Sequence, residues 1–74
     1  MCLKDCPVGF QGRIKMLKGP ATLKRRLLEM GLVPGKFFKI VRNAPLLDPL
    51  EIEIMGYYLA VRKEEAAYVL VEKA

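Results

Sequence analysis

The chain lacks the residues on which most enzyme chemistry depends. Its 74 residues include no histidine, no serine and no tryptophan, and Thr22 is the only hydroxyl residue besides three tyrosines. Without imidazole, no histidine base and no histidine metal ligand is available. A Gly-rich loop ending in Gly-Lys-Ser/Thr, which would bind nucleotide phosphates, is also missing. We therefore predict a protein that is not an enzyme and has no resident cofactor.

Cysteine is scarce and confined to one end. Cys2 and Cys6 both lie in the first six residues. Their spacing is half of a tetrahedral metal site, and one chain has no further Cys or His to complete it, although two chains could supply four thiolates. A disulfide between them would close only a tiny loop and stabilise little. We expect residues 1–6 to form a frayed tail with non-functional thiols, and keep Cys2 and Cys6 as weak metal-ligand candidates.

Long hydrophobic runs are absent too. No stretch approaches the roughly 18 to 20 apolar residues that span a bilayer, and the first residues lack the apolar segment of a signal peptide. We therefore expect the protein in the cytoplasm, where it could also lie at the inner face of the cell membrane. A hydrophobic content of 53% is ample for a core and argues against disorder. The length indicates one small domain, which we assign to residues 7–74.

Positive charge is concentrated in the first half of the chain. The formal net charge is +5. Residues 1–42 hold ten basic and two acidic residues, a net +8, whereas residues 43–74 hold three and six, a net −3. A basic half of this kind suits an acidic partner, an anionic membrane surface or nucleic acid. A solvated basic face with no partner is an equally good interpretation.

The hydrophobic pattern predicts one helix after a first strand at residues 8–17. Pro20 suits a helix start, and the apolar residues Leu23, Leu27 and Met30 recur at helical spacing over Ala21–Met30. Leu28 falls about 130° from the centre of that apolar face. It is either packed under a loop or exposed for a partner, and the helical phase alone leaves both open.

Alternating apolar residues predict further strands at 36–42, 50–54, 57–61 and 69–71, with one helical turn at 63–67. Tyr57 is expected to point inward, and Glu64 and Glu65 to be solvated. Five strands with strong twist predict a mainly β fold, a small antiparallel barrel. The predicted core comprises Leu23, Leu27, Phe38, Ile40, Ile52, Ile54, Leu59, Val61, Val69 and Val71.

Three segments carry a resemblance to a known family. In residues 25–35, a helix ends at a glycine, and two apolar residues lead into a Pro-Gly turn; residues 44–50 and 56–66 match in the same order. This set resembles the bacterial ferrous iron transport protein A family, the FeoA-like domains. The resemblance implies an SH3-like barrel with a helical insertion after the first strand. It also implies a cytoplasmic accessory that docks on a large membrane ferrous iron transporter with a GTP-binding domain.

Two other functions stay open. A small basic barrel could bind nucleic acid, with few exposed aromatics for stacking. FeoA-like domains also resemble the C-terminal domain of iron-dependent bacterial repressors, of which this chain would be a stand-alone relative. The oligomeric state is not predicted. For the docking hypothesis, the helix and the corner after it supply the candidate partner-binding residues: Lys24, Arg25, Arg26, Leu28, Glu29, Leu32 and Pro34.

Overall fold

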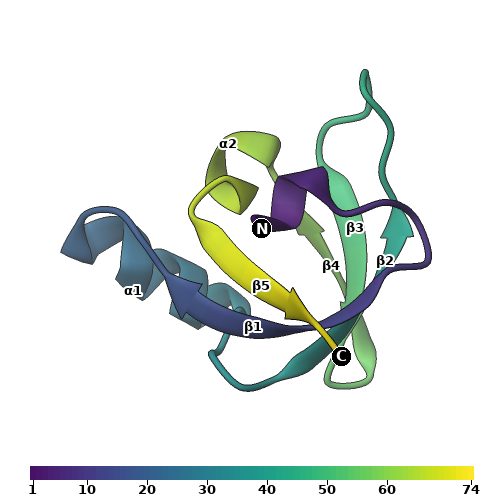
Figure 1. Ribbon diagram of the computed structural model, residues 1–74. Helices are drawn as coiled ribbons and strands as arrows, with labels where there is room; N and C mark the ends of the chain where they lie inside the picture. Colours follow the sequence, from purple (N-terminus) through teal and green to yellow (C-terminus); the bar gives the residue numbers. More distant parts are fainter.

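The computed structural model describes residues 1–74 and contains five strands around one core, with a helix projecting from one side (Figure 1). The helix follows the first strand, as predicted. Two short helical turns precede the first strand and the last. In chain order the elements are η1 (Leu3–Asp5), β1 (Gln11–Leu17), α1 (Ala21–Met30), β2 (Phe37–Arg42), β3 (Leu50–Ile54), β4 (Tyr57–Val61), α2 (Lys63–Ala66) and β5 (Val69–Lys73).

The five strands form one antiparallel sheet in the order β4-β3-β2-β1-β5. The register shifts between Ile14 and Met16 and again between Ile40 and Arg42. Such bulges increase the local twist, which helps a short sheet to curl around its own apolar face. The ribbon shows this curl (Figure 1). The predicted small antiparallel barrel is confirmed.

Helix α1 begins and ends where the sequence predicts. Pro20 is its N-cap, and Gly31 is its C-cap with φ 113°. The Gly31 N–H donates to the Leu28 carbonyl at 3.0 Å, and the Leu32 N–H reaches back to Leu27 at 3.1 Å. These bonds satisfy carbonyls that a helix end otherwise leaves free. The chain therefore turns sharply at Gly31 toward β2.

The core matches most of the predicted set. Eight of the ten predicted residues are buried, and Leu23 and Leu59 are partly buried against them. Their alternation along the strands explains this success, because every second strand residue faces inward. The sequence analysis omitted seven further core residues: Leu3, Cys6, Ile14, Leu17, Leu32, Leu50 and Ala66.

The N-terminal segment is not frayed, so that interpretation is wrong. Leu3 and Cys6 are both 0% exposed. The Met1 carbonyl accepts a hydrogen bond from the Val71 N–H at 2.9 Å, so the N-terminal segment lies alongside β5. The Asn43 side-chain amide donates to the Cys6 carbonyl at 2.8 Å. Burial of Leu3 and these bonds fix residues 1–6 against the barrel.

Two further expectations about side chains are wrong. Tyr57 is 41% exposed rather than inward, and its hydroxyl donates to the Met30 carbonyl at 3.5 Å. Glu65 is only 6% exposed rather than solvated. Its carboxylate accepts the Arg62 N–H at 3.2 Å, which caps the short helix α2.

Neighbouring leucines on α1 provide a matched test of how the helix packs. We expect Leu27→Ala to lower the free energy of unfolding by about 2–5 kcal/mol, because it leaves a cavity at a fully buried position. Leu28→Ala should change it by about 0.5 kcal/mol or less, since Leu28 is 44% exposed. Urea denaturation of both variants measures the difference. Equal stabilities would contradict the described packing of α1.

Candidate docking surface

The outward face of α1 is a charged surface around one apolar residue. Lys24, Arg25 and Glu29 are exposed, and Leu28 is 44% exposed beside them. The structure therefore decides the open question about Leu28 in favour of exposure. Arg25 and Glu29 form no ion pair. Their charges remain available to a partner, and an exposed leucine with a charged rim has the composition of a modest interface.

The corner after α1 contributes less than the sequence analysis expected. Leu32 is 0% exposed, so it belongs to the core and cannot contact a partner. Its burial follows from the turn at Gly31, which directs the next side chain under the helix. Pro34 is exposed. Hydrogen bonds between the corner and Ile14 of β1 hold the turn: the Gly35 N–H donates to its carbonyl at 2.8 Å.

Arg26 is occupied by a contact within the chain. Its guanidinium lies 2.7 Å from the Glu65 carboxylate, which is only 7% exposed, whereas the Arg26 side chain is 63% exposed. The pair joins α1 to α2 across a groove of about 390 Å³, to which Leu23 and Tyr68 also contribute. Sequence reasoning missed this groove, because no local pattern relates residues so far apart in the chain.

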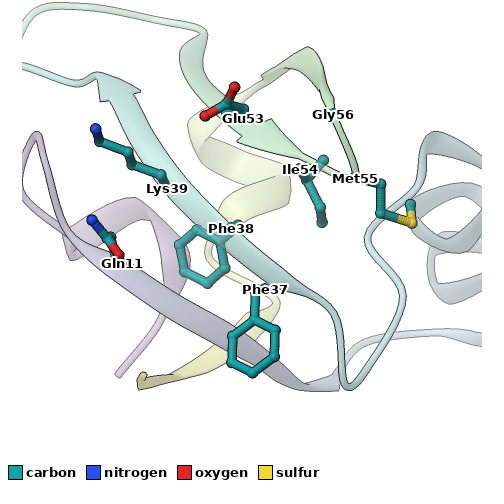
Figure 2. A pocket seen from close by; sticks show the side chains of 8 residues that line it. All are labelled: Gln11, Phe37, Phe38, Lys39, Glu53, Ile54, Met55 and Gly56. Atoms are coloured by element: carbon teal, nitrogen blue, oxygen red, sulfur yellow. The ribbon is translucent and has the colours of Figure 1, made fainter.

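A second concave surface lies over β1, β2 and β3 (Figure 2). It measures about 290 Å³. Gln11, Lys39 and Glu53 lie opposite one another on adjacent strands and cross it as a polar row. Phe37 at its edge is 64% exposed, and Met55 is 49% exposed. The sequence analysis identified neither as a surface residue, since aromatic and long apolar side chains in strands are usually buried.

The two cysteines lie in an environment that suppresses their reactivity. The Cys2 thiol donates to the Asp5 carboxylate at 3.0 Å. Burial raises the pKa of Cys6 to about 11, and the neighbouring Cys2 and Asp5 add to the shift. Burial and the bond to Asp5 also raise the pKa of Cys2. Because the thiolate is the metal-binding and nucleophilic form, these shifts disfavour both roles.

The acidic and cysteine side chains do not gather into a cluster that could hold a metal ion. No three His, Cys, Asp or Glu residues converge.

Glu72, whose pKa is lowered by the hydrogen bond and charge of Arg13, pairs with that residue at the exposed edge of the β1–β5 ladder. No helix is both long and apolar enough to cross a membrane.

These features define a small domain, in which a five-stranded antiparallel barrel carries one exposed, charged helix. Comparison with known proteins gives the family. The FeoA domain model matches residues 1–73, and the chain belongs to this family. The expected resemblance is confirmed over almost the whole chain.

Three relatives illustrate the match. A Fe(2+) transport protein A/Fe(2+) transporter FeoB fusion protein of Porphyromonas gingivalis is 40% identical over 72 residues, 97% of this chain and 8% of that protein. The structure of iron(II) transport protein A from Clostridium thermocellum is 38% identical with a TM-score of 0.90, covering 100% of this chain and 46% of that one. The zinc complex of Stenotrophomonas maltophilia FeoA, described as an SH3 domain protein, is 28% identical with a TM-score of 0.76, covering 97% and 89%.

The SH3-like barrel is therefore confirmed as the fold. A manganese-dependent transcriptional repressor also contains it, at 12% identity and a TM-score of 0.89 over 41% of its chain. That likeness concerns the fold alone. The chain spans only 8% of the length of the fusion protein, so the activity of that whole protein is not transferred to it.

The Arg26–Glu65 ion pair can be tested against the neighbouring free arginine. Arg26→Gln removes the cation that pairs with the nearly buried Glu65 carboxylate. We expect the free energy of unfolding to fall by about 1 kcal/mol, a small value for such a pair because the Arg26 side chain is largely exposed to solvent. Arg25→Gln should cost about 0.5 kcal/mol or less. Chemical denaturation compares the two, and equal losses would show that the pair contributes nothing specific.

Thiol accessibility gives a separate prediction. In the folded protein at neutral pH, iodoacetamide should modify Cys2 slowly and leave Cys6 unmodified, because Cys6 is buried and its pKa is raised to about 11. In denaturant both should react, and mass spectrometry counts the adducts. The Cys2→Ser variant serves as control, since native labelling of that variant would mean that the N-terminal segment opens.

Proposed function

We propose that this chain is a cytoplasmic, non-catalytic accessory of bacterial ferrous iron uptake, which binds the membrane transporter FeoB through the outward face of α1. The observation that supports this most is the fusion of a 40% identical FeoA domain to FeoB in one polypeptide. A domain that is covalently joined to a transporter in one bacterium is a natural docking partner for that transporter elsewhere. The GTP-binding domain of the transporter is the expected contact.

The helix is the part of the fold most suited to such docking. It is inserted between β1 and β2, and its C-terminus is held by the Gly31 turn and the Tyr57 hydroxyl. A rigid helix presents its side chains with little loss of entropy on binding. Leu28 then supplies the apolar contact, and Lys24 and Arg25 supply charge for an acidic surface.

Nucleic-acid binding receives less support, because the basic residues of the sheet are not grouped together. Two basic residues of β2 lie opposite acids: Lys39 pairs in register with Glu53, and Arg42 with Glu51. These acids interrupt the positive potential that phosphate backbones require. The charge distribution therefore favours a protein partner over nucleic acid.

Substitutions on the outward face of the helix test the proposal. Arg25→Glu and Leu28→Asp should each weaken binding to the isolated GTP-binding domain of FeoB by about tenfold or more, because they remove a rim charge and the central apolar contact. Calorimetry with the domain in its GDP-bound and nucleotide-free states, and with a GTP analogue, measures the affinity. Lys73→Glu makes the same charge change on β5 and serves as control.

The controls separate docking from folding. Both helix variants alter exposed side chains and should retain the parental unfolding midpoint. Unchanged affinity in both would move the interface away from α1. Absence of binding by the parent protein in every nucleotide state would contradict the proposed partner.

A further inference from the structure

Strand β4 is an open and uncharged sheet edge. Its sequence, Tyr57–Val61, contains no charged residue and no proline, whereas each of the other four strands contains charged residues. It pairs with β3 on one side and ends the sheet on the other. No backbone hydrogen bond outside that ladder involves β4. Its outer edge therefore presents free N–H and C=O groups, which can template a further strand.

The opposite edge of the sheet is protected. Beside β5, Cys2 forms a bridge with Leu70, and the Met1 carbonyl accepts the Val71 N–H at 2.9 Å. β5 also carries Glu72 and Lys73. Charges and a covering segment are the usual means by which proteins block edge pairing. Only β4 lacks both.

We propose that β4 pairs with β4 of a second copy of this chain, in an antiparallel two-fold arrangement centred on Leu59. In this register Tyr58 lies opposite Ala60 of the second copy, and Tyr57 opposite Val61. Beyond the strand, Arg62 lies opposite Gly56. No charged residue therefore faces a like charge, and both copies contribute the same surface, as a two-fold contact requires.

Charge restricts where two copies of this chain can meet. Each chain has a net charge of +5, so two copies repel one another wherever basic surfaces meet. β4 is the one strand at which the two copies can approach without like charges facing each other. The contact is smaller than the roughly 20–30 residues a side of a standard interface, and we expect a weak dimer whose population rises with concentration.

Tyr58 and Phe37 provide a matched pair of variants, since each is 64% exposed and aromatic. Tyr58→Lys places the lysines of the two copies diagonally across the two-fold axis, where they repel each other. Within each chain the new lysine lies opposite Glu53 of β3, and this pair of opposite charges should preserve folding. Phe37→Lys makes the same change on β2, whose two edges are both occupied. Sedimentation equilibrium of the parent and both variants over a wide concentration range measures dimerisation.

We expect a parental dimer whose dissociation constant is about tenfold higher in Tyr58→Lys and nearly unchanged in Phe37→Lys. Isotope-filtered NMR should show contacts between the Leu59 residues of the two copies. A parent that stays monomeric at all concentrations overturns the proposal, as does a dimer weakened by Phe37→Lys alone or by both variants equally. A monomeric parent whose binding to FeoB is weakened by Tyr58→Lys would assign the edge to a strand of the transporter.

Discussion

The fit at Gly31 is the constraint on which the rest of the fold depends. Its φ of 113° is a conformation that residues with a Cβ rarely adopt, and an ideal Cβ there would lie 2.1 Å from the Tyr57 hydroxyl oxygen. The backbone conformation therefore requires glycine, and a Cβ would in addition displace the Tyr57 hydroxyl from its place at the helix end. This residue ends α1, directs Leu32 into the core and lets the β3–β4 hairpin approach the helix. A residue with a Cβ would strain the turn that joins the helix to the barrel.

That junction also determines which helix residues are exposed. Gly31 ends α1 in a fixed turn, and in this arrangement Leu27 is 0% exposed while Leu28 is 44% exposed. A loosely attached helix would bury both leucines in turn. The exposed leucine thus follows from the geometry of the junction, and a fixed apolar side chain is worth more to a partner than a mobile one.

Local patterns predicted the parts of the molecule that local physics controls. The bounds of α1 followed from Pro20, Gly31 and helical spacing, and the inward residues of β2 and β3 from strict alternation. The failures involve contacts between distant segments. The burial of Leu3 depends on the barrel it covers, and the burial of Glu65 on the guanidinium of Arg26 from another helix. Neither contact has a signature in the neighbouring sequence.

The charge distribution divides the surface into two kinds of contact site. The outward face of α1 has unpaired charges, which suit an oppositely charged partner and rapid association. The β4 edge has hydrogen-bonding groups and no charge, which suit another strand. These sites lie on different elements and depend on different forces, so high salt should weaken the first and spare the second. The proposed transporter contact and the proposed contact with a second copy therefore use separate surfaces of one small barrel.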